Sequence, residues 1–301
     1  MHFTSATVLA LAGIASAHTH MFSVWVNGED QGDGRGKYIR SPPNNSPITD
    51  LTLPAVACNV KGGEAVPEFV TAAAGDSLTF EWYHDARGDD IIAESHKGPI
   101  ITYIAEYTES DGSDAGWTKI SQDGLDGDQW AVDRLIAAQG KWDFRLPASL
   151  KAGKYLIRQE VIGLHEADVA YSEDPARGAQ LYPSCVQVEV TGGGANVPDQ
   201  GFSFATGYTD QTPGIVFNIY PDEDEDGEDG EDGEGGGEGD GEGAGDESAN
   251  RRVRAAAPLG EYNIPGPELW TEAAPGSGSG SGGNATGTRS LRIKGRAVVR
   301  V

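Results

Sequence analysis

The sequence predicts an all-β protein, built as an antiparallel β-sandwich with long loops. Between residues 18 and 220, short runs rich in Val, Ile, Thr, Tyr and Phe are bounded by Gly, Pro, Asp and Asn. Several runs alternate apolar and polar residues, as a half-buried antiparallel strand requires. The turns between them carry Asn-Gly, Asp-Gly and Ala-Gly pairs.

Six runs are the clearest strand candidates, and one segment has the pattern of a short helix. The strand candidates cover residues 20–28, 76–84, 99–107, 140–147, 154–165 and 185–192. The helix candidate covers 130–140 and ends at Gly140, because glycine is the usual residue just past a helix end.

The first 17 residues have the features of a secretory signal peptide. Residues 8–14 are apolar and are followed by Ala15-Ser16-Ala17, a small-x-small cleavage pattern, although no Lys or Arg precedes them. The run is too short for a membrane span, which needs about 20 apolar residues, and no later run is long enough. We therefore expect a secreted protein that begins at His18 after cleavage and has no membrane partner.

The net charge of −25 is unevenly distributed along the chain. Residues 18–221 contribute −15, residues 222–247 contribute −15 and residues 248–301 contribute +5. A nucleic-acid partner is disfavoured and we expect none, because phosphate binding needs a basic face. A neutral substrate fits this charge better.

Composition divides the mature chain into a folded domain over residues 18–272 and a tail. Within the domain, the stretch 222–260 begins with an Asp/Glu/Gly run, which we expect to be disordered because it has almost no apolar residues. Residues 273–301 have the composition of a flexible Gly/Ser linker followed by a short basic tail, with no carbohydrate-binding module. The linker contains a glycosylation sequon at Asn284.

The two cysteines, Cys58 and Cys185, are expected to form one disulfide. An even pair in an oxidising compartment most simply pairs with itself. Such a bond would close a loop of more than a hundred residues and contribute roughly 4 kcal/mol in the chain-entropy model.

The histidines are the best candidates for chemistry. No Cys-x-x-Cys, His-Glu-x-x-His or Gly-x-Ser-x-Gly pattern is present, so the usual zinc and serine-hydrolase sites have no support. Carboxylates are abundant, but nothing in the sequence identifies a glycosidase pair. An N-terminal His18 would offer its α-amine and its imidazole to one metal. With a second imidazole these make a three-nitrogen site that suits copper. The alternative is that His18 is an ordinary first residue.

Several motifs, which follow one another in a fixed order, make this chain resemble a known family. "AHTHMFSVWVNGEDQG" begins the likeness, "SPITDLTLPAVACN" surrounds the first cysteine, and "ESHKGPIITYIA" carries a histidine in a loop. "WTKI", "YLIRQEVIGLHEA", "GAQLYPSCVQVEVTG" and "IPGPELW" follow. Together they resemble the fungal lytic polysaccharide monooxygenases of auxiliary activity family nine, once called glycoside hydrolase family sixty-one.

The resemblance implies an immunoglobulin/fibronectin-like β-sandwich and a set of site residues. One copper ion would be held by His18, His96 and, in an axial position, Tyr182. His165 and Gln180 would act beside the copper as catalytic residues, donating hydrogen bonds to the oxygen species. Gln180 and Tyr182 are two residues apart, so on a strand they share one face.

Plainer interpretations remain open for these side chains. Tyr182 could be a core tyrosine, and His165 could be an interior histidine with satisfied hydrogen bonds. His20 resembles a variable strand position, and His84 is expected to be exposed in the polar loop "WYHDARGDD".

The chain departs from the family pattern in two places. Gln159 stands where a histidine is often found. The stretch 222–260 intervenes where the family has a short loop beside the substrate face, on which Tyr220 is the candidate to stack on a sugar ring. This insertion could alter substrate binding, or it could be a tolerated solvated loop.

The resemblance therefore implies a secreted, monomeric copper monooxygenase that cleaves the β-1,4-glucan of cellulose at C1 or C4. It would use an external electron donor together with hydrogen peroxide or dioxygen. The main alternative is a secreted copper-binding protein that has the histidine site but does not cleave polysaccharides oxidatively. A third possibility is a glycan-binding module.

Overall fold

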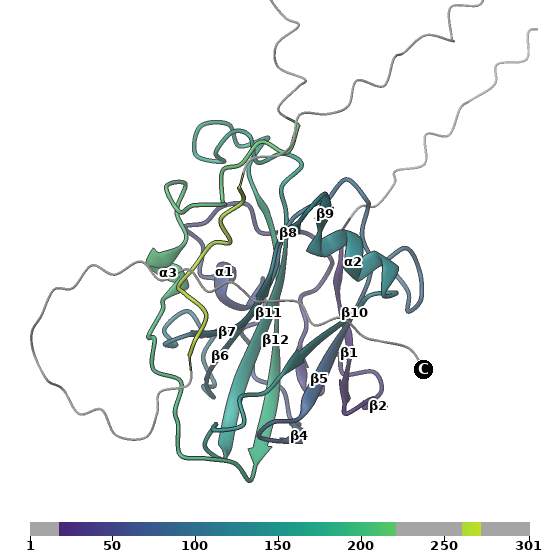
Figure 1. The fold of residues 1–301 in the computed structure, drawn as a ribbon, viewed down its shortest axis with the longest axis vertical. Helices are drawn as coiled ribbons and strands as arrows, with labels where there is room; N and C mark the ends of the chain where they lie inside the picture. Colours follow the sequence, from purple (N-terminus) through teal and green to yellow (C-terminus); the bar gives the residue numbers. More distant parts are fainter. Residues whose placement is uncertain (1–17, 221–260, 272–301) are drawn as a thin grey trace, which may run out of the picture.

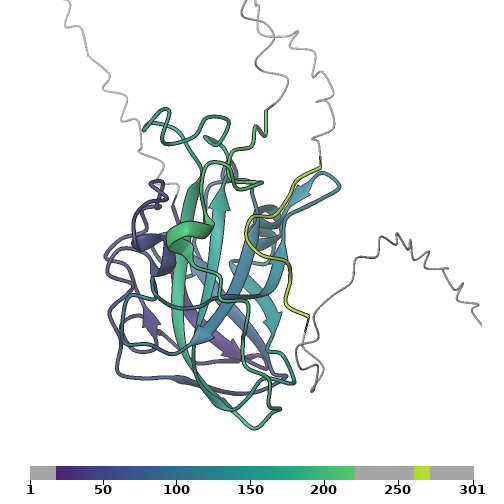
Figure 2. The ribbon, with the colours of Figure 1, turned by 90° about the vertical axis from the view of Figure 1, so that its left-hand side faces the viewer.

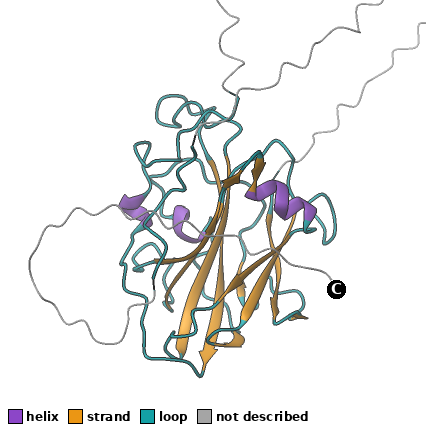
Figure 3. Cartoon of the chain, viewed as in Figure 1, coloured by secondary structure: helices purple, strands orange, loops and turns teal. Residues whose placement is uncertain are grey.

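The computed structural model describes residues 18–220 and 261–271. Two β-sheets face each other, and long loops connect them (Figures 1 and 3). The predicted all-β sandwich is confirmed. The predicted signal peptide 1–17, the insertion 222–260, the tail 273–301 and Asn284 lie outside the described residues.

The first sheet has the strand order β10-β5-β1-β2 and is antiparallel throughout. Its strands are β1 (His20–Val26), β2 (Glu29–Asp30), β5 (Ser77–Tyr83) and β10 (Lys141–Arg145). Alternation sets its faces: Leu78 and Phe80 are fully buried in the core, whereas Thr79 and Glu81 point to the outer face. The first, second and fourth strand candidates of the sequence form β1, β5 and β10.

The second sheet has the order β3-β12-β11-β6-β7, and β4 pairs with β12 in parallel. Its strands are β3 (Ile39–Arg40), β4 (Val70–Ala73), β6 (Ile100–Glu106), β7 (Thr118–Asp123), β11 (Gly153–Gly163) and β12 (Gln180–Thr191). The strand candidate at 185–192 is longer than expected, because β12 begins at Gln180. The extra residues bring Gln180 and Tyr182 into the ladder opposite Gly163 and Val161 of β11.

Helices are few and short, and a small hairpin completes the fold. The helices are α1 (Ala55–Cys58), α2 (Ala131–Ala137) and α3 (Phe204–Gly207), and the hairpin pairs β8 (Leu125–Asp126) with β9 (Gln129–Trp130). The predicted helix is α2. Its chain turns away at Gly140, where φ is +79° and an added Cβ would lie 2.2 Å from the Trp82 carbonyl oxygen.

The core lies between the sheets, and a second apolar cluster covers the far face of the second sheet. Trp117, Phe204 and Tyr208 belong to that cluster. The segment 261–271 runs alongside this sheet in Figure 2, where the Trp270 amide donates to the Lys119 carbonyl at 2.8 Å. Burial of these aromatic side chains stabilises the sandwich on the side away from the first sheet.

Cys58 and Cys185 form the predicted disulfide, at a sequence separation of 127. The bond joins α1 to β12, three residues after Tyr182. None of the helices in the described ranges is long and apolar enough to cross a membrane.

Candidate metal centre

Three side chains from distant parts of the sequence form a triangle at one end of the sandwich. The ring centroids of His18 and His96 are 6.1 Å apart, those of His18 and Tyr182 are 5.9 Å apart, and those of His96 and Tyr182 are 6.0 Å apart. His18 lies two residues before β1, His96 precedes β6 and Tyr182 is on β12. The structure thus brings the three expected ligand residues together.

His18 is positioned by the first sheet. Its neighbour Thr19 donates its hydroxyl to the Tyr83 carbonyl at 3.1 Å, which continues the pairing of β1 with β5 toward the N-terminal end. The His18 ring is partly exposed. Its pKa is lowered by burial and, to a smaller extent, by the charge of His84, which favours the neutral imidazole that a metal requires.

His96 is held by a backbone loop that binds to β11. Leu164 donates its amide to the Lys97 carbonyl at 2.9 Å, and Ile162 donates to the Pro99 carbonyl at 3.1 Å. Gly98 permits this close approach, because an added Cβ would lie 1.9 Å from the Ile162 carbonyl oxygen. The loop therefore fixes where His96 stands relative to the end of β11.

The chemistry of His96 fits a metal ligand. The residue is 2% exposed, and within the described residues its Nε2 is buried without a hydrogen-bond partner. A buried nitrogen without a partner costs free energy unless something binds it. Burial, followed by repulsion from His165 and His18, lowers the pKa of His96 to about 3. The imidazole is thus neutral and keeps a lone pair for a metal ion.

Tyr182 supplies a neutral phenol. It is 1% exposed, and burial raises its pKa above the ordinary tyrosine range. Its hydroxyl donates to Oε1 of Gln180 at 2.7 Å, so the shared strand face predicted for these two residues is present. A protonated phenol is a weak metal donor, which suits the axial position expected for Tyr182.

His165 lies against His96 at the end of β11. The two ring centroids are 3.9 Å apart and the rings are tilted by 37°. Within the described part of the chain, Nδ1 of His165 is also buried without a hydrogen-bond partner. This unpartnered nitrogen favours a role beside the metal over a fully satisfied interior histidine, and that role stays a prediction.

Gly163 makes room for this pair of rings. An added Cβ there would lie 3.2 Å from Cδ2 of His96 and 3.4 Å from Nδ1 of His165. The sequence analysis missed this residue, because a glycine within a strand pattern indicates a close approach without saying to what.

Gln159 fills the core. It is fully buried, accepts a hydrogen bond from the Trp82 indole at 2.8 Å and donates to the Thr102 hydroxyl at 3.0 Å. Its amide is therefore engaged on both sides, and its contacts join β11 to β5 and β6.

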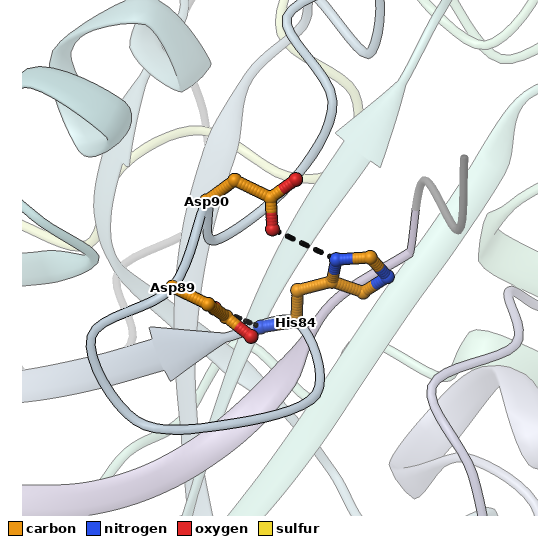
Figure 4. A group of neighbouring side chains, drawn as sticks. All are labelled: His84, Asp89 and Asp90. Atoms are coloured by element: carbon orange, nitrogen blue, oxygen red, sulfur yellow. Dashed lines mark hydrogen bonds and ion pairs between the residues drawn. The ribbon is translucent and has the colours of Figure 1, made fainter. Parts of the chain in front are cut away.

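The prediction that His84 is exposed is wrong: the residue is 6% exposed. Its Nδ1 lies 2.8 Å from a carboxylate oxygen of Asp90, as Figure 4 shows. The loop folds over because Asp89 accepts four backbone N–H bonds, from His84, Asp85, Ala86 and Ile91. His84, Asp89 and Asp90 are close enough to hold a metal ion, but these bonds already occupy the oxygens of Asp89. The group is a loop scaffold.

A charged cluster follows His165 directly, and the sequence analysis missed it. Arg177 pairs with Glu166 at 3.0 Å and with Asp168, and the Gly178 amide donates to the Glu166 carbonyl. The three side chains are partly exposed beside the His165 end of β11. No local motif predicts the cluster, because Asp168 and Arg177 are nine positions apart in the sequence.

Tyr220 is the last residue of the first described range and is 38% exposed. Its segment is attached to the loop after His165, because Phe217 donates its amide to the Ala167 carbonyl at 2.7 Å. An exposed aromatic ring on this segment is compatible with stacking on a sugar, which stays a prediction.

Comparisons with known proteins agree with this geometry. A sequence model of Auxiliary Activity family 9 (formerly GH61) matches residues 18–227. An AA9 family lytic polysaccharide monooxygenase A of Collariella virescens is 58% identical over 226 residues, which cover 73% of this chain and 82% of that protein. A protein of the same description from Schizophyllum commune is 47% identical over 87% of this chain and 93% of its own length.

Solved structures show the same fold. A structure described as CvAA9A superposes with a TM-score of 0.71 at 50% sequence identity, covering 84% of this chain and 98% of its own. A cellulose-active polysaccharide monooxygenase from M. thermophila has a TM-score of 0.59 at 24% identity, which supports the fold.

Proposed function

This chain belongs to Auxiliary Activity family 9 and is a lytic polysaccharide monooxygenase, and we propose that it cleaves the β-1,4-glucan of cellulose with one copper ion. The observation that carries the proposal is the triangle of His18, His96 and Tyr182, in which the buried Nε2 of His96 has no hydrogen-bond partner among the described residues. A related enzyme described as cellulose-active supports the choice of substrate.

Copper would be held by the α-amine and ring of His18 and by the ring of His96, with the phenol of Tyr182 beside it. The α-amine becomes available only if the preceding 17 residues are removed, as the Ala-Ser-Ala site predicts. The family match begins at His18, which supports cleavage at that point. Family members are secreted, and we propose that this chain leaves the cell by the same signal-peptide route.

When bound, copper supplies one-electron chemistry with an external reductant and with hydrogen peroxide or dioxygen. The protein's own residues set the conditions for this chemistry. Burial keeps His96 neutral, and Gln180 orients the Tyr182 hydroxyl. His165, at the edge of the site, would donate a hydrogen bond or a proton.

Substrate is held outside the sandwich, because a chain within a crystalline polymer cannot enter a pocket. Tyr220 would stack on a sugar ring, and the Glu166–Asp168–Arg177 cluster beside His165 would offer hydrogen-bond partners for hydroxyl groups. Hydroxylation at C1 or C4 followed by elimination at the neighbouring glycosidic bond would break the chain.

Mass spectrometry of soluble products from microcrystalline cellulose, with and without reductant, tests this function. The expected result is oxidised cello-oligosaccharides that require both copper and reductant. A matched enzyme with one extra residue before His18 should lose tight copper binding and this activity together. Tight copper binding in the mature protein without oxidised products would instead indicate a copper-binding protein that does not cleave polysaccharides.

A further inference from the structure

A cavity of about 810 Å³ opens on the outer face of the first sheet. Its walls come from β1, β5 and β10, from the segment 87–94 and from the end of α2. None of the proposed copper or catalytic residues lines it. Its volume is that of a ligand-binding pocket, with room for about two or three sugar rings.

A network of charged side chains forms the base of the cavity. Glu81 is 5% exposed although it lies on the outer face of the sheet. It accepts hydrogen bonds from Nε1 of Trp25 and from Nε of Arg87, both at 2.7 Å. Arg87 also pairs with Asp30, so one guanidinium faces two carboxylates. This network orients the Trp25 indole and leaves one net negative charge at the base.

The lining combines aromatic and aliphatic surface. It includes the half-buried ring of Trp25 and the partly buried side chains of Ala93 and Ile136. The rim is polar: Gln139 and Glu94 are exposed there. The Lys141 ammonium lies 4.2 Å from the Trp25 ring centroid and has no carboxylate partner within the described residues.

These walls define the chemistry of a ligand. An aromatic ring together with aliphatic surface suits a flat molecule with apolar C–H faces. An amide, an ammonium and a carboxylate at the rim offer both donors and acceptors to hydroxyl groups. Carboxylates outnumber cations in the lining, so an anionic ligand is disfavoured. A pyranose ring, with apolar faces and hydroxyl groups around its edge, matches this arrangement.

We propose that this cavity, lined by Trp25, Glu94, Gln139 and Lys141, is a second carbohydrate site that binds short neutral oligosaccharides. It goes beyond the proposed activity and does not depend on copper. Bound sugar would lie on the Trp25 ring after the flexible Lys141 side chain moves aside to contact a hydroxyl group.

The indole N–H signals of the mature, copper-loaded protein, kept free of reductant, test this site by NMR. The chain has six tryptophans, so the signal of Trp25 is the one that disappears in Trp25→Phe. Cellotriose should shift the Trp25 signal saturably, with a dissociation constant in the millimolar range. The signal of Trp82, whose indole is bonded to Gln159 in the core, should not move.

Substitutions at the rim test whether the shift of the Trp25 signal reports binding in this cavity. Gln139→Ala and Lys141→Ala should each weaken binding about fivefold or more, as the loss of one hydrogen bond predicts. Asp143→Asn, on the same strand and face as Lys141 but outside the cavity, should not change the affinity. Tyr220→Ala should also leave the affinity for cellotriose at this cavity unchanged. A variant that loses cellulose binding at Tyr220 can therefore be told apart from one that loses binding at the cavity.

The proposal is overturned if cellotriose leaves the Trp25 signal in place. It is also overturned if spermidine or citrate shifts that signal and cellotriose does not, because the pocket would then select a charged ligand. Equal affinity in the wild type and both rim variants would exclude the site as well.

Discussion

The imidazole rings of His96 and His165 lie 3.9 Å apart, centroid to centroid, although they belong to different loops. Backbone hydrogen bonds from Ile162 and Leu164 to the residues just after His96 hold the two loops together. The same pair of backbone hydrogen bonds therefore positions the proposed copper ligand His96 and its neighbour His165. We expect a displacement of one ring to move the other.

We predict that His165→Ala keeps tight copper binding and loses about 10- to 100-fold in oxidative turnover, as outer-shell substitutions commonly do. The lost imidazole lies beside the proposed ligand His96, and the nitrogens proposed to bind copper remain. Copper affinity by calorimetry and oxidised products from cellulose are the two measurements. His165→Gln, which keeps a hydrogen-bond donor, should recover part of the rate. Equal turnover in wild type and His165→Ala would leave this histidine with no part in the reaction.

Gly163→Ala is expected to disturb the metal centre with little effect on the fold. The added methyl group would contact both His96 and His165 at 3.2–3.4 Å, so at least one ring must move by a few tenths of an ångström. Overpacking of this kind costs about 1–3 kcal/mol. The copper electron paramagnetic resonance spectrum should change, and turnover should fall.

Gly153→Ala is the matched control, because Gly153 begins the same strand and its added Cβ would be in ordinary contact with Tyr155 at 3.6 Å. Its spectrum and turnover should equal those of the wild type. If Gly163→Ala behaves in the same way, the spacing of the two rings does not matter for the site.

Much of the fold could be predicted from local pattern, because alternation in β1 and in the first half of β5 shows directly which face is buried. The residues of the site were harder to predict. His18 could be identified from the residues alone, since the cleavage site precedes it, whereas His96, Tyr182, His165 and Gln180 needed the family resemblance.

The features that were missed depend on contacts between distant segments. Burial of His84 results from a loop that closes on Asp89, and the role of Gly163 depends on a histidine 67 residues earlier in the chain. The Trp25 cavity combines side chains of β1, β5, β10 and α2. Composition and spacing along the chain do not record such proximity.

Lys119 should make the free energy of unfolding rise with pH between about 8 and 9.5. Its ammonium is 1% exposed and donates to the Pro265 carbonyl at 2.9 Å and to Gln122 at 2.7 Å. Burial lowers its pKa from 10.5 to about 8. Above pH 8 the unfolded chain therefore binds more protons at this residue than the folded chain does, so stability increases with pH. Below pH 8 both states are protonated and the contribution is constant.

Chemical denaturation at pH 7, 8, 9 and 9.5 measures this slope. Lys119→Met should remove the increase, whereas Lys151→Met, at an exposed position, should keep it. Measurement stops below pH 10, because burial raises the pKa of Tyr103 and Tyr208, and ionisation of these tyrosines in the unfolded chain would then oppose folding. An equal slope in Lys119→Met and wild type would assign the pH dependence to other groups.

Removing one charge from the buried pair of Arg158 and Glu160 should lower the free energy of unfolding far more than the same change in a surface pair does. Both side chains are 0% exposed and meet at 2.7 Å, and Glu160 also accepts a hydrogen bond from the Tyr208 hydroxyl. Glu160→Gln would leave the guanidinium buried without a counter-charge, which costs about 3–5 kcal/mol. For a domain of this size we expect the Tm to fall by about 10 °C.

Two further variants show whether the unpaired charge is the cause of that loss. The double variant Arg158→Met, Glu160→Gln removes both charges and should be more stable than Glu160→Gln alone, because no ion remains buried without a partner. Asp123→Asn removes the partner of Arg134 in a more exposed pair and should cost less than about 1 kcal/mol. Calorimetric unfolding of the four proteins compares them directly. If Glu160→Gln is as stable as Asp123→Asn, then the Val56 and Ala57 carbonyls, which also accept hydrogen bonds from Arg158, are sufficient to hold its charge.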